Sequence, residues 1–324
     1  MSADRRLAAY AMVVTAACCF VLNAGVSRVV LRAGVDPTAL TSLRVTGAVC
    51  VLAVSAAVLR PTALRPPRGR RLLLVVVLGM VGVAGVQWTY FVAIDRLTIG
   101  LALLLEYTAP LLVALYVRLV RREPVHPRVW AALVLSLVGL ALVAQVWKGL
   151  TVDGLGVLAG FGAAVCFATY FLLGESGVSE EDPVAVVLWS FLVAAVLMNI
   201  VDPLFAVDAD VLGQTTSLLG ALDAFSAPVW VLLVGIITLG TVTPFALELF
   251  ALQRLPAKVV VVVAMLEPVG VSALGWAWFG ESLTPIQVVG SAAVVVGIVA
   301  AQLARPAAVP DHPPLPGLDV PPHR

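Results

Sequence analysis

Leu103-Leu104-Leu105-Glu106-Tyr107-Thr108-Ala109-Pro110 places a carboxylate inside an apolar run that is long enough to cross a membrane. A second apolar run, Val263-Ala264-Met265-Leu266-Glu267-Pro268, repeats this pattern, and Pro268 lies 158 positions after Pro110. The two acids are offset by three residues in that register, so they are not strict equivalents. A charged side chain at the centre of a membrane span costs about 3 kcal/mol. Both stretches therefore indicate a functional pathway through a membrane protein.

The composition supports the same class of protein. Hydrophobic residues make up 61% of the chain, charged residues 12%, and the mean hydropathy is +1.06. Ten apolar segments can be drawn, each close to the roughly 20 residues that a spanning helix needs. They lie at about 8–31, 37–59, 72–94, 98–119, 129–147, 154–174, 184–205, 228–251, 257–279 and 284–304. The sequence thus predicts an all-α integral membrane protein with ten transmembrane helices.

The basic residues predict the orientation of these helices. With the N-terminus in the cytoplasm, 15 of the 20 Lys and Arg residues fall on the cytoplasmic side and four on the other side. Cytoplasmic loops carry such an excess of Lys and Arg. We therefore expect both termini of this multi-pass membrane protein to be cytoplasmic.

The chain repeats itself in two halves, 8–147 and 154–304, followed by a Pro-rich tail at 305–324 that is expected to be disordered. Besides the two acidic stretches, Ala16-Ala17-Cys18-Cys19-Phe20 resembles Ala163-Ala164-Val165-Cys166-Phe167, and Asp36-Pro37 recurs as Asp182-Pro183. Each half has five helices, and because five is odd the second half begins on the opposite side of the membrane. The repeats are therefore inverted, as in many secondary transporters.

Four charged residues fall within the predicted helices: Arg44, Glu106, Glu248 and Glu267. At about 1.5 Å per residue, Arg44 and Glu106 lie at similar depths of about 10 and 12 Å below the outer surface. This predicts that they interact, directly or through a substrate. The alternative is that Arg44 reaches the outer headgroups.

Glu267 lies close to the midplane, directly before Pro268, which removes a backbone hydrogen bond one turn earlier. It is the best single candidate for binding an ammonium group or a proton; the alternative is a protonated carboxyl in an interhelical hydrogen bond. Pro110 and Pro244 are further candidate helix breaks. Glu248, four residues after Pro244, lies about one turn from the inner end, so it either takes part in the site or reaches the cytoplasm.

Polar and aromatic side chains within the predicted helices are candidates for lining a cavity between the halves, although at helical spacing they are more often packing residues. The candidates are Gln87, Tyr90, Tyr107 and Trp189, together with Asn23, Trp88 and Tyr170.

Motifs of other functional classes are missing from the sequence. There is no Gly-rich phosphate loop, no metal-ligand cluster and no Ser/His/Asp set, so neither an enzyme nor a metal or cofactor site is expected. The net charge of +1 gives no indication of a nucleic-acid partner. Without an ATP-binding motif, active transport has to be driven by a gradient.

Several motifs together resemble the EamA-type branch of the drug/metabolite transporter superfamily, and within it the bacterial threonine/homoserine exporter subgroup. They are Ala39-Leu40-Thr41-Ser42-Leu43-Arg44-Val45, Leu105-Glu106-Tyr107-Thr108-Ala109-Pro110-Leu111, Leu247-Glu248-Leu249, Arg254-Leu255-Pro256, Met265-Leu266-Glu267-Pro268 and Gly280-Glu281-Ser282-Leu283-Thr284-Pro285-Ile286-Gln287. The resemblance covers residues 8–304. It implies an inner-membrane exporter of amino acids or related small metabolites with a central cavity.

The leading hypothesis is gradient-coupled export of a small amino acid by alternating access. Glu106 and Glu267 would bind the substrate amine or a proton, and Arg44 a carboxylate. The expected partners are the small-molecule substrate and the lipid bilayer, with protons and a second copy of the chain as further candidates. Multidrug efflux and a membrane solute sensor without transport are the alternatives.

Overall fold

The structure is a computed structural model, and it describes residues 3–97, 99–147, 153–180, 182–204 and 209–304. Within these ranges, ten helical spans are long and apolar enough to cross a membrane. The prediction of an all-α membrane protein with ten spans is therefore confirmed. The Pro-rich tail at 305–324 lies outside the described residues.

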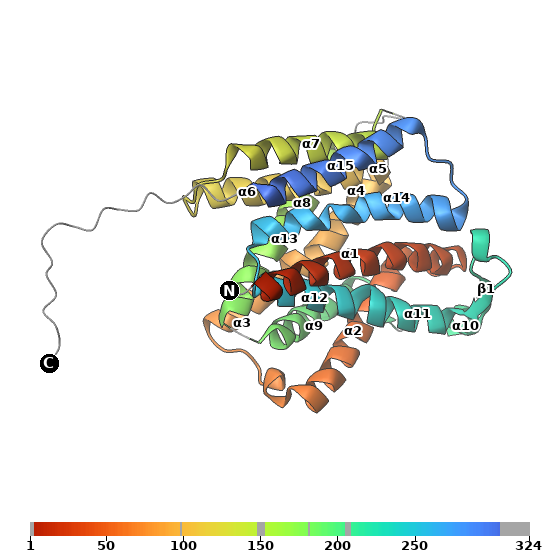
Figure 1. The fold of residues 1–324 in the computed structure, drawn as a ribbon. Coiled ribbons are helices and arrows are strands. Elements are labelled where there is room, and N and C mark those ends of the chain that lie inside the picture. Colours follow the sequence, from red (N-terminus) through yellow and green to blue (C-terminus); the bar gives the residue numbers. More distant parts are fainter. Residues whose placement is uncertain (1–2, 98, 148–152, 181, 205–208, 305–324) are drawn as a thin grey trace, which may run out of the picture.

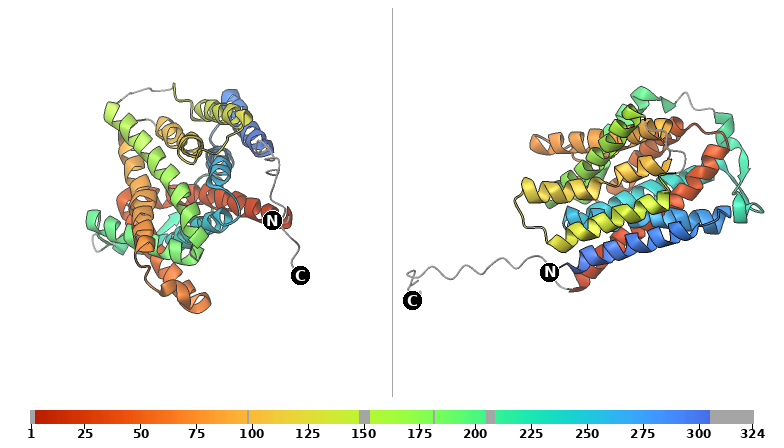
Figure 2. Two further views of the ribbon diagram at one scale, coloured as in Figure 1. Left: turned by 90° about the vertical axis from the view of Figure 1, so that its left-hand side faces the viewer. Right: turned by 90° about the horizontal axis from the view of Figure 1, so that it is seen from above.

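The helices are arranged as a bundle that is capped at one end by a short β-hairpin (Figures 1 and 2). The first elements are α1 (Ala3–Arg32), α2 (Pro37–Leu59), the 3-10 turn η1 (Pro61–Leu64), α3 (Arg70–Val77), the π-helical segment η2 (Leu78–Gly85), α4 (Val86–Arg96), α5 (Ile99–Glu106), α6 (Ala109–Leu119) and α7 (Pro127–Ala144). The later elements are α8 (Gly154–Glu180), α9 (Pro183–Val201), α10 (Ala209–Gly213), β1 (Thr215–Ser217), the 3-10 turn η4 (Gly220–Leu222), β2 (Ser226–Pro228), α11 (Val229–Ile237), the π-helical segment η5 (Thr238–Val242), α12 (Thr243–Leu252), α13 (Ala257–Ala264), α14 (Leu266–Phe279) and α15 (Pro285–Leu303).

The Asp-Pro pairs that echo each other in the sequence start equivalent helices. The Asp36 carboxylate caps α2 by accepting a hydrogen bond from the Thr38 N–H at 2.8 Å, and Asp182 caps α9 by accepting from Val184 at 2.9 Å. In each case a proline follows at the first helical position, where its missing N–H costs nothing. Hydrogen bonds from the Thr38 hydroxyl and backbone lower the pKa of Asp36 below its usual range.

Four spans are interrupted, and the interruptions recur in the 158-residue register. The π-helical segments η2 and η5 interrupt the third and eighth spans, and the breaks between α5 and α6 and between α13 and α14 interrupt the fourth and ninth. Pro110 and Pro268 each lie four residues after the last residue of the preceding helix. Because proline has no backbone N–H, the carbonyl of that last residue lacks its helical hydrogen bond. Such π-helical turns and broken helices are frequent at functional sites in membrane proteins.

The last spans of the two halves, α7 and α15, pack closely side by side (Figures 1 and 2). A Cβ atom at Gly139 would come within 2.7 Å of the Gly290 carbonyl oxygen, and one at Gly290 within 2.6 Å of the Gly139 carbonyl oxygen. A Cβ atom at Gly297 would likewise come too close to Ser136 of α7. Small residues let helix backbones approach this closely in membranes, where packing replaces the hydrophobic drive between helices.

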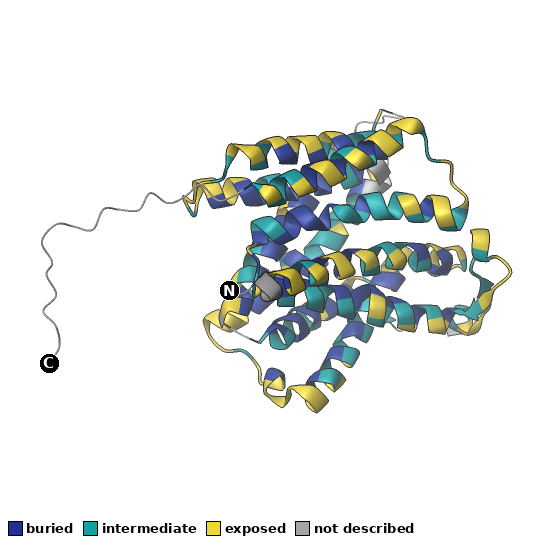
Figure 3. Cartoon of the chain, viewed as in Figure 1, coloured by how far each residue is buried: buried dark blue, intermediate teal, exposed yellow. Residues whose placement is uncertain are grey.

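Exposed residues lie along the outward faces of the helices (Figure 3), and many of them are large and apolar. Leu59, Val58 and Leu303 are 75%, 74% and 73% exposed, as a surface in contact with lipid requires. We call the end that carries the segments 60–70 and 120–127 the arginine-rich end. The hairpin of β1 and β2 caps the opposite end, where its Leu218 carbonyl accepts from the Trp278 indole N–H at 3.1 Å.

Candidate functional site

The two broken spans meet inside the bundle. Tyr107 lies in the break between α5 and α6, and its hydroxyl donates to Oε2 of Glu267 at 2.9 Å. Glu267 lies in the first turn of α14, directly after the other break. Glu106 is the last residue of α5 and Glu267 the second residue of α14. The two acids therefore flank equivalent breaks from opposite sides, which explains their offset of three residues in the sequence register.

A cavity of about 310 Å³ surrounds this contact. Most of the polar residues predicted from the sequence line it: Arg44, Gln87, Tyr90, Glu106, Tyr107, Glu248 and Glu267, together with Asn23 and Tyr170. They come from α1, α2, α4, α5, α8, α12, α14 and the α5–α6 break, so both halves of the chain contribute. Helical rotation, which the sequence does not fix, turns these side chains toward one space.

Among the described residues the structure forms no direct ion pair between Arg44 and Glu106, but both line the same cavity, so an interaction through a substrate stays a prediction. Nε of Arg44 is buried without a hydrogen-bond partner. Arg44 lines the cavity rather than reaching for the headgroups. A buried donor without a partner is costly, so this nitrogen is suited to bind an anionic group that enters the cavity.

Glu248 also belongs to the cavity, although its position near the predicted helix end left open whether it would reach the cytoplasm. It is 3% exposed and faces the cavity beside Phe245. The Tyr170 hydroxyl, which lines the same cavity, is buried without a hydrogen-bond partner. Pro244, at the start of α12 directly after η5, lies one turn before this acid.

Trp189 lies elsewhere. Its indole N–H donates to the carbonyl of Ala63 at 3.1 Å, and it lines a separate hollow with Arg65 and Arg68 at the arginine-rich end. Trp88, the other tryptophan considered from the sequence, is 53% exposed on the outer face of the bundle.

An aromatic wall of the cavity was missed in the sequence analysis. Phe20, Phe167 and Phe245 line it, and the ring centroids of Phe20 and Phe245 lie 5.3 Å apart in an edge-to-face arrangement. A signal was present, because Phe20 and Phe167 close the two echoed stretches of the first helix of each half. We read those residues only as a sign of the repeat.

The site therefore combines one guanidinium, three carboxylates and several rings in a space between two helix breaks. Among the described residues, no group of three or more His, Cys, Asp or Glu side chains is arranged to hold a metal ion. The sequence profile of the EamA-like transporter family matches residues 7–145 and again residues 154–301.

The chain belongs to the EamA-like transporter family.

Curated proteins similar to this EamA-like chain include exporters. It is 29% identical over 228 residues to the "Threonine/homoserine exporter RhtA" of Escherichia coli (strain K12), covering 69% of each chain. The protein of the same name from Salmonella typhimurium (strain LT2) is 29% identical over 222 residues, 68% of each chain. An "Uncharacterized transporter" of Archaeoglobus fulgidus is 27% identical over 214 residues, 66% of this chain and 70% of that one.

A solved structure described only as "Crystal structure of protein" has the same fold. Its TM-score is 0.74 at 20% identity, covering 91% of this chain and 96% of that one. The family and these relatives establish a transporter, not an enzyme, and a multi-pass protein of the bacterial inner membrane.

Proposed function

We propose that this chain exports a small amino acid by alternating access, with 8–147 and 154–304 as inverted halves and both termini in the cytoplasm. The observation that carries this proposal is the cavity between the two helix breaks, because it combines one guanidinium with three carboxylates. A zwitterion needs an anionic and a cationic partner close together. The relatives named as threonine/homoserine exporters support the choice of substrate.

In this proposal Arg44 binds the substrate carboxylate through its free guanidinium nitrogen, and Glu267 binds the ammonium group. The Tyr107 hydroxyl, at 2.9 Å, holds the Glu267 carboxylate in position. Glu106 and Glu248 are the candidates for exchanging protons during the cycle, since both are buried in the same cavity. At about 310 Å³ the cavity lies near the lower limit of the roughly 300–1,000 Å³ typical of ligand pockets, which favours a small substrate.

Counterflow into proteoliposomes preloaded with threonine, homoserine or another small neutral amino acid tests the proposal. We expect accumulation of the labelled amino acid with the wild type and none with Glu267→Gln. Asp223→Asn is the matched control, because this carboxylate lies in the turn between β1 and β2 and accepts from Ser217 at 2.5 Å, away from the cavity. Normal flux through Glu267→Gln would contradict the assignment of the site.

The aromatic wall favours a second candidate, efflux of hydrophobic organic cations, since rings and carboxylates together attract such cations. Resistance of expressing cells to these compounds, without amino-acid counterflow, would replace the amino-acid substrate with this one. Binding of an amino acid without any flux would instead indicate a solute sensor.

A further inference from the structure

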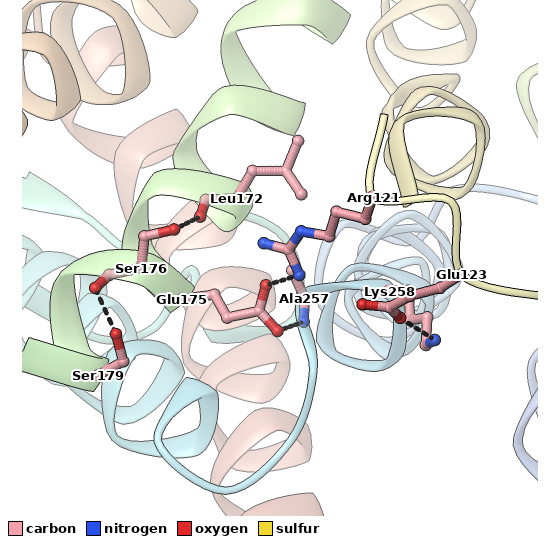
Figure 4. A network of polar contacts seen from close by, with 8 residues as sticks. All are labelled: Arg121, Glu123, Leu172, Glu175, Ser176, Ser179, Ala257 and Lys258. Carbon is pink, nitrogen blue, oxygen red and sulfur yellow. Dashed lines mark hydrogen bonds and ion pairs between the residues drawn. The ribbon is translucent and has the colours of Figure 1, made fainter. Parts of the chain in front are cut away.

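At the arginine-rich end of the bundle, the Glu175 carboxylate joins three segments of the chain (Figure 4). Glu175, on α8, forms an ion pair at 2.6 Å with Arg121, which follows α6. Its other oxygen accepts a hydrogen bond at 3.1 Å from the backbone N–H of Ala257, the first residue of α13. We call Glu175, Arg121 and the Ala257 N–H the latch. The side chains of Arg121 and Glu175 are only 29% and 19% exposed, so solvent screens this pair less than an ordinary surface pair.

Apolar packing continues inward from the latch. One position before Glu175, Gly174 lets α8 approach α12 so closely that a Cβ atom would lie 2.8 Å from Leu249 and 3.1 Å from Leu252. These leucines are 2% and 4% exposed. They fill the space between α8 and α12 beside the latch.

The inverted repeat relates the latch to the opposite end of the bundle. The 147-residue offset of the first helices aligns Glu175 with Arg28, and the 158-residue offset aligns Arg121 with Phe279. Arg28 lies over the Phe279 ring, 4.3 Å from its centroid, and forms an ion pair with Glu281. Equivalent positions therefore meet at both ends.

The two ends differ in the third contact of the latch. Ala257 aligns with Ile99, the first residue of α5, and α8 packs along α13. No packing of that extent joins α1 to α5 in the described part of the chain. Instead, toward the end opposite the latch, the cavity is lined by Ser27 and Leu31 of α1 and by Pro37 at the start of α2. Equivalent helices are thus joined at the arginine-rich end and parted at the other end, as one state of an alternating-access cycle requires.

We propose that Glu175 is the residue that closes the arginine-rich end of the transport path, and that this end opens when its carboxylate leaves Arg121 and the Ala257 N–H. The proposal rests on the transport function proposed above, since only a cycle of opening and closing needs such a contact. It adds two transport residues, Glu175 and Arg121, that touch no substrate. The expected effect of their loss is a shift in the balance between the two states.

Thiol labelling measures that balance without knowledge of the substrate. In a chain whose four cysteines are replaced by alanine, Leu252→Cys reports on the arginine-rich end and Ser27→Cys on the opposite end. Each is labelled with a maleimide in the purified full chain in nanodiscs. Loss of a hydrogen bond to a charged group is expected to shift the balance on the order of tenfold. Glu175→Gln and Arg121→Gln should therefore speed labelling of Leu252→Cys by up to that factor and slow labelling of Ser27→Cys.

Arg60→Gln is the matched control. It removes an arginine from an ion pair at the same end, Arg60 with Asp182 at 3.2 Å, but the Arg60 side chain is 62% exposed. Exposed pairs contribute little, so its labelling rates should equal those of the wild type. The melting temperature of each variant, measured in parallel, identifies any variant that fails to fold. The charge-swapped chain with Arg121→Glu and Glu175→Arg should return the labelling rates only part of the way to those of the wild type, because an arginine at position 175 can form the ion pair but cannot accept from the Ala257 N–H.

Unchanged labelling in both Glu175→Gln and Arg121→Gln would overturn the proposal, and so would faster labelling at both reporter positions, which means general loosening. Opposite changes at the two reporters without amino-acid counterflow would keep the latch and refute the substrate. Amino-acid counterflow with unchanged labelling would keep the amino-acid substrate and refute the latch.

Discussion

Replacing Tyr107 with phenylalanine tests the contact that joins the two halves at the centre of the cavity. The Tyr107 hydroxyl is a single donor to Glu267 at 2.9 Å, and the residue is only 4% exposed, so water does not readily replace it. A hydrogen bond to a charged group contributes about 1.5–3 kcal/mol. Tyr107→Phe should therefore lower the free energy of unfolding by about this amount. It should also weaken amino-acid binding about tenfold or more, because the Glu267 carboxylate loses the group that positions it.

Tyr10→Phe is the control, since it removes a bond of the same length outside the cavity. The Tyr10 hydroxyl donates to Gln302 at 2.9 Å and joins α1 to α15 at the arginine-rich end. We expect both variants to lose stability in thermal unfolding, whereas only Tyr107→Phe raises the KM of counterflow and loses the stabilisation given by bound threonine. An equal effect of both variants on KM, or none with Tyr107→Phe, would refute the role of Tyr107 in positioning Glu267.

Two further predictions concern the scaffold. Gly139→Ala places a methyl group against the backbone of α15, and because side-chain movement cannot relieve this contact, the variant should lower the free energy of unfolding by about 1–3 kcal/mol. Gly235→Ala is the control: nothing lies within 4 Å of an added Cβ atom there, so it should be neutral or stabilising. Equal melting temperatures of the two variants would contradict the close α7–α15 packing. Asp36→Ala removes the cap of α2 and should cost about 1 kcal/mol at neutral pH. Because the folded state lowers the pKa of Asp36, this stabilisation is present above the unfolded pKa and is lost as the pH falls through the folded one, so the melting temperatures of wild type and variant should converge in acid. A constant difference down to the lowest pH would show that the carboxylate charge is not involved.

What the sequence left open depended on the rotation of the helices. Depth along the spans places Arg44 near Glu106 but gives no rotation; in the structure both line one cavity with Glu267. The distance of Glu248 from a helix end left two positions open, and the structure buries this acid in the cavity after η5. Trp189 has the amphipathic character of a lining residue, but its indole is used to hold Ala63.

The sequence alone determined the ten spans, because crossing a bilayer requires about 20 consecutive apolar residues and few other structures satisfy the backbone there. It also determined which residues were worth attention, since a carboxylate in a span such as Glu106 or Glu267 is too costly to lack a purpose. Only the tertiary structure decided that three acids and Arg44 share one cavity, that Phe20 and Phe167 form its wall, and that Glu175 joins three segments at one end. These facts depend on how each helix is rotated and where it is broken, and hydropathy along a single chain determines neither.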